Sequence, residues 1–325
     1  MPVTMSYYAD AIREALRHEM ERDDKVILMG EDIALYGGSF GVTRGLFEQF
    51  GAQRVINTPI SEGGFTGVAV GAAITGMRPI VEYMFMDFIA LASDQIVNHA
   101  AKFRDIYGEQ AKVPIVFRAA AGAGRSYGAT HSQMLEGWFM QIPGLKVVAP
   151  AFCDDAYGLL LSAIRDDNPV LVVEHKDLYK VRMPFNNETE PIPFGLARTV
   201  REGDDVVIFS YSKMVHTAAL ASVELEKEGI SAEVVDLRSL RPLDVDTIAE
   251  AASRCGKAVV VTESMKTAGP SAEIVSVIME EAFDFLEAPI LRIATEEVAI
   301  PFAPHLEQQV LPSVDEIVKQ VKTLF

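Results

Sequence analysis

The sequence predicts an α/β protein with two domains, each a mainly parallel sheet flanked by helices. Its 325 residues are enough for two domains of roughly 150 residues each. Short apolar runs alternate with longer helical patterns, which is typical of parallel strands joined by crossover helices. Several of these runs are apolar at every position, as expected for strands that are covered on both faces.

The same alternation defines the elements of both domains. The expected strands of the first domain are 25–29, 54–57, 79–85, 113–118, 145–149 and 170–174, with helices at 63–76, 88–103 and 154–165. Prolines and an Asn-Asn pair disfavour regular structure from 176 to about 195. We therefore expect domains at 1–176 and 196–325, joined by a linker at 177–195. The expected strands of the second domain lie near 206–209, 232–235, 258–262 and 290–293.

Composition narrows the possible partners. The net charge of −17 would repel a phosphate backbone, so no nucleic acid is expected. No apolar run approaches the ~20 residues that cross a bilayer, so no membrane is expected. Cys153 and Cys255 lie far apart with no spaced histidines, which excludes a disulfide framework and a zinc site. The first residues lack signal-peptide features, which favours a cytoplasmic location or a processed organellar chain.

One expected helix is rich in glycine. Gly63, Gly67 and Gly71 recur every four residues and therefore share one helical face. Each costs about 1 kcal/mol relative to alanine, so we expect another helix to approach this face closely. The approaching helix belongs either to the same domain or to another subunit.

Glu62 is the first candidate site residue. It follows the expected strand 54–57 and a turn at Pro59, and it opens the glycine-rich helix. Sites in parallel α/β sheets form at the carboxyl ends of strands. The alternative is that the carboxylate only complements the helix dipole, which stabilises a helix by about 0.3–1 kcal/mol.

Two further candidates follow other expected strands. Asp87 comes after 79–85 as a candidate helix N-cap, with Phe88 just inside the helix, where a core aromatic is the usual explanation. His131 lies in a polar loop after 113–118 and is one of six histidines. Each of these three signals for a functional site is weak by itself, and the three together are stronger evidence for a site than any one of them.

Eight segments resemble, in order and spacing, the β subunit of the thiamine-diphosphate-dependent 2-oxo acid dehydrogenase family. That family includes pyruvate, branched-chain 2-oxo acid and acetoin dehydrogenases and is akin to transketolase. The segments are 30–38, 58–62, 70–73, 76–80, 131–133, 143–148, 163–169 and 240–243. The resemblance covers nearly the whole chain and implies a transketolase-like pyrimidine-binding domain followed by a transketolase C-terminal-like domain.

The resemblance also implies partners and cofactors. It implies an α2β2 heterotetramer in which thiamine diphosphate lies between chains, and a lipoyl acyltransferase core that accepts the acyl group. The α subunit would hold the diphosphate and Mg²⁺ through a Gly-Asp-Gly motif, which this sequence lacks. This chain should therefore contact only the aminopyrimidine end of the cofactor. The substrate would be a 2-oxo acid or acetoin.

By the same resemblance, Glu62 would hydrogen-bond the pyrimidine nitrogen N1′ and favour the imino tautomer that removes the C2 proton. Ile60 and Met84 would line this pocket, and Phe88 would pack on the ring. His131 would steady charge or move a proton during acyl transfer to lipoamide.

A structural K⁺ site is a further expectation. The last carbonyls of helix 154–165 lack intrahelical partners and carry the negative end of the helix dipole. In the family, carbonyls at such a place bind K⁺, and the alternative is a helix end capped by water. The matching positions are Ala163, Ile164, Asp166 and Asn168, together with Ile115 from the neighbouring strand.

Two features leave the function open. Residues 122–130 and 174–176 are most similar to the acetoin branch, so the substrate is not fixed. One alternative function is half of a split transketolase-like enzyme, which transfers a ketol unit and needs no lipoamide. Another is a non-catalytic assembly subunit, which the intact Glu62 and His131 argue against.

Overall fold

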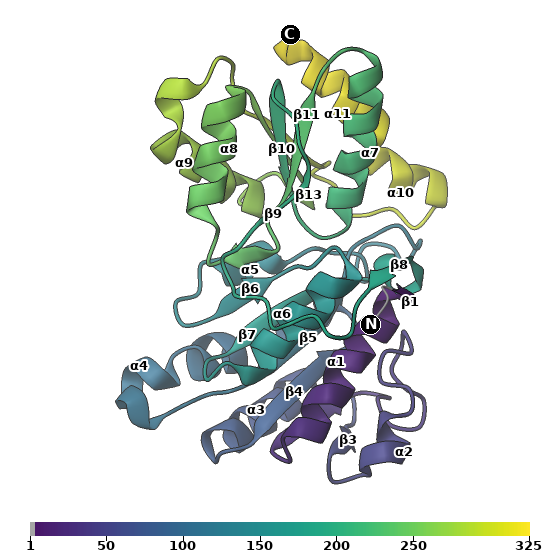
Figure 1. Cartoon of the computed structure of the whole chain (residues 1–325). Helices are drawn as coiled ribbons and strands as arrows, with labels where there is room; N and C mark the ends of the chain where they lie inside the picture. Colours follow the sequence, from purple (N-terminus) through teal and green to yellow (C-terminus); the bar gives the residue numbers. More distant parts are fainter. Residues whose placement is uncertain (1–3) are drawn as a thin grey trace. The chain divides into compact units, whose positions relative to one another are not determined.

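The computed structural model describes residues 4–325, and the chain divides into two compact units. The first unit includes the chain up to Ala121 and Phe139–Phe194. The second consists of Gly122–Trp138 and Gly195–Phe325. The chain therefore enters the second unit, returns to the first, and leaves it again after Phe194. Figure 1 labels the elements described below.

The first unit contains six parallel strands in the order β6-β7-β5-β4-β2-β3. They are β2 (Val26–Gly30), β3 (Val55–Asn57), β4 (Arg78–Tyr83), β5 (Val116–Ala121), β6 (Lys146–Val148) and β7 (Val170–His175). All six expected strands are confirmed, with ends shifted by up to three residues. A separate antiparallel pair joins β1 (Thr4–Tyr7) to β8 (Arg182–Phe185).

Helices cover both faces of this sheet. The helices of this unit are α1 (Tyr8–Arg22), α2 (Leu46–Phe50), α3 (Glu62–Ile74), α4 (Phe103–Tyr107) and α6 (Cys153–Arg165), while α5 (Glu136–Met140) lies where the chain re-enters the unit. Helices α1 and α6 pack side by side over one face, where Val26 and Leu28 join their core (Figure 1). Tyr83 points to the opposite face, and its hydroxyl lies 2.7 Å from that of Thr66 on α3. This double cover explains why the strands are largely apolar.

The expected helix 88–103 is wrong as a single helix. The chain forms a 3₁₀ segment η1 (Met86–Ala92), a π-helical segment η2 (Gln95–Ala100) and then α4. Asp87 is not an N-cap, because it lies inside η1 and the cap position is Phe85. The irregular winding coincides with a close approach of α3, since a Cβ on Gly63 would lie 2.9 Å from the carbonyl oxygen of Leu91.

The three glycines of α3 do not share one explanation. Gly63 is required by the backbone of η1, and a Cβ on Gly67 would lie 3.2 Å from Oε1 of Gln95. A Cβ on Gly71 would meet nothing within 4 Å. Internal packing therefore accounts for Gly63, whereas Gly71 lies open beside Val68, which is 62% exposed. For the outer face of α3, the alternative that a helix of another subunit approaches it therefore stays a prediction.

The second unit contains a five-stranded sheet in the order β14-β13-β10-β11-β9. Its strands are β9 (Arg198–Arg201), β10 (Val206–Ser210), β11 (Ala232–Asp236), β13 (Ala258–Met265) and β14 (Leu291–Thr295). All are parallel except the edge strand β9. The four expected strands are therefore confirmed, and β9 and the short β12 (Ser239–Arg241) are additional.

Helices cover this second sheet as well. They are α7 (Lys213–Lys227), α8 (Val245–Cys255), α9 (Pro270–Glu281), α10 (Pro304–Val310) and α11 (Val314–Val321). Helices α7 and α11 pack together, as do α8 and α9 (Figure 1). Short 3₁₀ segments are η3 (Gly108–Gln110), η4 (Leu178–Lys180), η5 (Phe283–Phe285) and η6 (Lys322–Leu324). Within residues 4–325, no helix combines the length and hydrophobicity that crossing a membrane requires.

Candidate active site

The candidate residues of this unit lie at the carboxyl ends of the parallel strands of the first sheet, which is called the carboxyl edge below. Glu31 follows β2 directly, and Glu62 opens α3 shortly after β3. Met84 and Phe88 follow β4. Because these strands are parallel, their carboxyl ends lie at one edge of the sheet, which is where open α/β sheets place ligands. Glycine at position 30 is required here, since a Cβ would lie 2.6 Å from the carbonyl oxygen of Glu82.

Glu31 and Glu62 form a pair of buried carboxyl groups. They are only 4% and 5% exposed. Within residues 4–325, Oε1 of Glu31 has no hydrogen-bond partner. Burial, followed by repulsion from Glu62, raises the pKa of Glu31 to about 7, while the backbone amide of Ser61 opposes the rise. Glu31 therefore changes charge near neutral pH, and the electrostatic field at Glu62 changes with it.

Glu31 is not among the site residues predicted from the sequence, although it lies in segment 30–38, which is part of the family resemblance. A usable signal was present, because Glu31 follows an apolar strand as directly as any candidate. The strand-end rule that selects Glu62 selects Glu31 as well. The pairing of the two carboxyl groups was not visible, since it depends on β2 and β3 being neighbours.

The three apolar candidates lie open. Ile60 is 79% exposed, and Met84 and Phe88 are half-buried. The ring of Phe88 packs edge-on against Phe85 with centroids 6.3 Å apart. Phe88 is therefore not a fully buried core aromatic. Together these side chains offer apolar surface at the strand ends that the unit itself does not cover.

A buried ionic network lies on the sheet beneath this edge. Arg118 on β5 donates from Nε and Nη2 to Glu174 on β7, over 2.6 and 2.8 Å, and from Nη1 to Glu82 on β4, over 2.5 Å. The Tyr179 hydroxyl donates to Glu174 over 2.8 Å. Burial raises the pKa of Glu82, and the charge of Arg118 opposes that rise. The network fixes the end of β4 directly before Met84. This network is not among the features predicted from the sequence, although a charge inside an apolar strand requires a buried partner.

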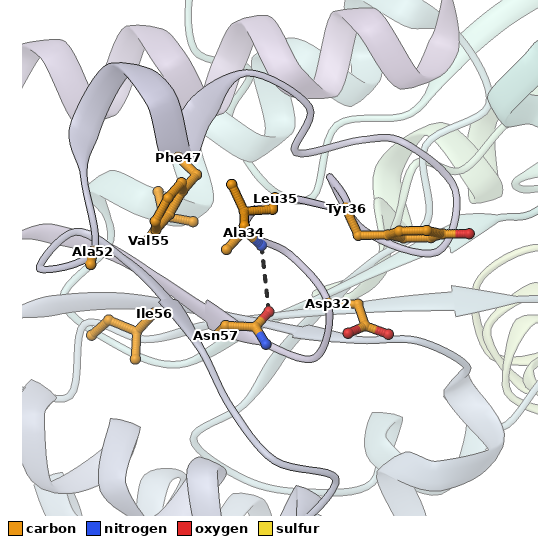
Figure 2. A pocket seen from close by; sticks show the side chains of 9 residues that line it. All are labelled: Asp32, Ala34, Leu35, Tyr36, Phe47, Ala52, Val55, Ile56 and Asn57. Atoms are coloured by element: carbon orange, nitrogen blue, oxygen red, sulfur yellow. Dashed lines mark hydrogen bonds between the residues drawn. The ribbon is translucent and has the colours of Figure 1, made fainter.

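A surface hollow of about 490 Å³ lies beside the edge strand β3. Figure 2 shows its lining, in which Oδ1 of Asn57 accepts a hydrogen bond from the amide of Ala34 over 3.4 Å. Leu35 and Tyr36 contribute to the lining and are strongly exposed. None of the candidate site residues lines this hollow. The carboxyl pair therefore marks the candidate site better than the hollow does.

His131 belongs to the second unit, in the segment Gly122–Trp138. Its backbone amide donates to the carbonyl of Gly128 over 3.3 Å. Its ring Nδ1 lies 3.0 Å from the hydroxyl of Thr130. The side chain is half-buried. The two candidate catalytic residues, Glu62 and His131, thus belong to different units, and each is held by its own surroundings.

The expected K⁺ positions gather around the end of α6, and arginine side chains bind several of their oxygens. Arg78 donates from Nε to the carbonyl of Ile164 over 2.8 Å and from Nη2 to that of Asp166 over 2.5 Å. The helix end is therefore capped by a guanidinium group and not by water alone. Because a carbonyl oxygen has two lone pairs, a K⁺ ion would have to share these acceptors with Arg78.

Three further oxygens at the expected K⁺ positions are also hydrogen-bonded. The side-chain oxygen of Asn168 accepts from Arg104 over 2.7 Å. The carbonyl of Ile115, which precedes β5 and is not part of it, accepts from the amide of Val170 over 3.0 Å. The carbonyl of Ala163 accepts a long bond of 3.4 Å from the amide of Asp166.

Comparison with known proteins identifies the family. Residues 5–182 match the transketolase pyrimidine-binding domain, and residues 195–317 match the transketolase C-terminal domain. The pyruvate dehydrogenase E1 component subunit beta of Rickettsia felis is 48% identical over 313 residues, which cover 96% of both chains. The chain belongs to the β-subunit family of the thiamine-diphosphate-dependent 2-oxo acid dehydrogenases.

A further relative agrees with this family, and a solved structure agrees with the fold. The mitochondrial pyruvate dehydrogenase E1 component subunit beta-2 of Oryza sativa subsp. japonica is 45% identical over 317 residues, covering 96% of this chain and 84% of that protein. A solved structure named split gene transketolase, inactive beta4 tetramer, superposes with a TM-score of 0.80. It is 24% identical, covers 98% of this chain and 97% of that one, and shows the fold alone. The family resemblance and the transketolase-like fold are confirmed.

The family's cofactor fits the carboxyl edge of the first unit. A buried Glu62 next to a carboxyl group with an unsatisfied oxygen offers hydrogen-bonding capacity in an otherwise apolar place. The half-buried side chains of Met84 and Phe88 offer the apolar contact that a planar ring requires. Within residues 4–325, no three His, Cys, Asp or Glu side chains are placed to hold a metal ion.

Proposed function

We propose that the chain is the β subunit of a pyruvate dehydrogenase, which decarboxylates pyruvate and transfers the acetyl group to lipoamide together with an α subunit. The observation that carries the proposal is the buried Glu31–Glu62 pair at the carboxyl edge of the parallel sheet. The names of the similar proteins from Rickettsia felis and Oryza sativa support pyruvate as the substrate.

Thiamine diphosphate supplies, when bound, the carbon nucleophile that cleaves the bond next to a 2-oxo group. Glu62 would hold the pyrimidine through a hydrogen bond at N1′ and set the protonation of the ring. Ile60, Met84 and Phe88 would bind the ring faces and exclude water from the reacting carbon. His131 would steady developing charge or move a proton at the carbonyl oxygen during acyl transfer.

The half-open site supports a partner that completes it. Ile60 is largely exposed, and the sequence contains no Gly-Asp-Gly motif for the diphosphate. The α subunit would supply that motif and Mg²⁺ in an α2β2 heterotetramer, and a lipoyl acyltransferase would receive the acyl group. Calorimetry tests this directly: the isolated chain should bind thiamine diphosphate negligibly, and the assembled enzyme tightly. Micromolar binding by the isolated chain would contradict the shared site.

The catalytic roles are separated by exchange of the cofactor's C2 proton with deuterium in the assembled enzyme. Glu62→Gln keeps the size of the side chain but removes the carboxyl group, so exchange should slow by on the order of 10²-fold. His131→Ala should leave exchange nearly intact and slow decarboxylation or acyl transfer. Normal exchange in Glu62→Gln would reduce Glu62 to a helix-end carboxylate. Equal slowing in both variants would move His131 to cofactor activation.

Acetoin cleavage is the second candidate function. Residues 122–130 and 174–176 favour it, and Lys176 within the latter is fully buried with its Nζ 5.0 Å from the ring centroid of Phe85. A substrate panel with the assembled enzyme distinguishes the candidates. Comparable kcat/KM values for pyruvate and acetoin would contradict the pyruvate assignment, and turnover without lipoamide would favour the split transketolase alternative.

A further inference from the structure

The loop that carries His131 has an unusual backbone. Gly122, Gly124, Ser126 and Gly128 all have positive φ, at 92°, 96°, 56° and 77°. Such an alternation aims successive amides away from any strand ladder, so these amides require other acceptors. A serine with φ near 56° is disfavoured sterically and persists only where the surroundings hold it.

Two buried carboxylates of the second unit accept these amides. Glu307 on α10 accepts from the amide of Gly124 through Oε1, and from that of Ser126 through Oε2, each over 2.9 Å. Glu263 on β13 accepts from the amide of Ala123 over 2.6 Å. Glu307 is 2% exposed, and within residues 4–325 it forms no ion pair. Hydrogen bonds to an ionised acceptor are about twice as strong as neutral ones, so the loop amides are the main partners that stabilise this buried charge.

The held segment extends to the histidine. Gly122 donates to the carbonyl of Gln133 over 3.3 Å and closes the base of the loop. Gly128, whose carbonyl accepts the amide of His131, packs against Phe302, which precedes α10. Residues that flank or form α10 therefore hold the loop on both sides of Tyr127, and the histidine follows directly.

We infer that Glu307 and Glu263 are positioning residues: their buried carboxylates fix the 122–131 loop and thereby set the placement of His131 for turnover. Two residues from the 195–325 part of the second unit would thereby act in the reaction through His131, and the inference rests on the proposed function of that histidine. Glu307 carries the larger share, since it binds two amides and the Ser126 hydroxyl, the latter over 3.5 Å.

Glu307→Gln tests the inference. The glutamine side chain keeps one accepting oxygen, but its NH₂ group replaces the other oxygen and faces a backbone N–H group of the loop. One of the two hydrogen bonds is therefore lost. Hydrogen exchange of the full chain, followed by mass spectrometry, should show peptides from 122–131 exchanging on the order of tenfold faster. In the assembled enzyme, kcat should fall by on the order of 10- to 100-fold with little change in KM, because small misplacements have effects of this size. Exchange of the cofactor's C2 proton should change less than about twofold.

Glu233→Gln is the matched control, because Glu233 is equally buried in the same unit and bonds Arg254 and not the loop. It should leave loop exchange and kcat near wild type even if it lowers the melting temperature as much. The double variant Glu307→Gln/His131→Ala should be no slower than His131→Ala alone, since the two changes act through one group. If Glu307→Gln does not fold, Glu307→Asp, which keeps the charge and shortens the reach, takes its place.

The outcomes separate this inference from the proposed function. Wild-type loop exchange in a folded Glu307 variant overturns the inference. Equal losses of turnover and C2 exchange also overturn it, since they indicate general disruption. Full turnover by His131→Ala would instead overturn the proposed role of the histidine, and loop exchange would still decide whether Glu307 anchors the loop.

Discussion

Replacing Glu31 with glutamine should change how the stability of the isolated chain depends on pH. The pKa of Glu31 is raised in the folded state from 4.5 to about 7. The folded state therefore binds a proton more tightly than the unfolded state between these values. Stability contributed by this group is lost as the pH rises through that window, because the ionised carboxylate is buried beside Glu62. Glutamine does not ionise, so the free energy of unfolding of Glu31→Gln should not fall in this way as the pH rises.

The magnitude follows from the size of the shift. One pKa unit corresponds to about 1.4 kcal/mol, so the full shift corresponds to a ceiling of about 3.4 kcal/mol above the folded pKa. We expect the free energy of unfolding of Glu31→Gln, relative to wild type, to increase by about 3 kcal/mol between about pH 4.5 and pH 8. Below that window the difference should be constant and reflect only the altered hydrogen bonding.

Urea unfolding at closely spaced pH values measures this difference. Glu48→Gln is the control, because Glu48 is exposed on α2 in the same unit, and its curve should run parallel to wild type. A Glu31→Gln curve that is also parallel to wild type across the window would refute the reasoning. The carboxyl pair would then be solvated in solution, and the site would lack the pH-sensitive field described above.

Three further predictions concern the network, the cation and the glycine helix. Arg118→Met leaves the carboxylates of Glu82 and Glu174 buried without their cation, so the free energy of unfolding should fall by about 3–5 kcal/mol. The fall should be smaller at acid pH, where Glu82 is protonated. A loss below about 1 kcal/mol in chemical denaturation would contradict the buried network. If K⁺ binds at the end of α6, the melting temperature should be higher in KCl than in choline chloride at equal ionic strength. At a hundredfold excess of K⁺ over its dissociation constant, the expected gain in the free energy of unfolding is about 2.7 kcal/mol. Identical melting curves in the two salts would mean that Arg78 caps the helix end without K⁺. Gly63→Ala should destabilise the isolated chain by about 1–3 kcal/mol through a clash with Leu91. Gly71→Leu should instead leave the chain folded and weaken its assembly with an α subunit. Normal assembly of Gly71→Leu, measured by analytical ultracentrifugation, would show that the Gly71 face of α3 is not part of the subunit interface.

The strands were predictable because their signal is local. Runs such as 26–29 and 206–209 are apolar at every position, and burial on both faces is the main reason for such a pattern. The helix expected at 88–103 failed for the opposite reason. Its 3₁₀ and π-helical winding coincides with contacts to α3, and such contacts are not visible in the local sequence.

Residues of the candidate site could be proposed only one at a time. The strand-end rule proposes Glu62 and points to Phe88, and the family resemblance adds Met84, but electrostatic coupling joins residues that are distant in sequence. Arg118 reaches partners 36 and 56 residues away, so neither pairing follows from local pattern. Glu307 lies 183 residues from Gly124, and nothing near either residue indicates that they meet.

The path of the chain through the second unit has a consequence for synthesis on the ribosome. Gly122–Trp138 emerges early, yet the carboxylate that binds Gly124 is 183 residues further along the chain. At about 5–20 residues per second, roughly 10–40 s pass before Glu307 is made. During that interval the amides of Gly124 and Ser126 lack the carboxylate that accepts them in the folded chain, and the positive φ of Ser126 is not held by that contact. The loop that carries His131 is therefore among the first segments of the second unit to be translated and among the last to reach its final conformation.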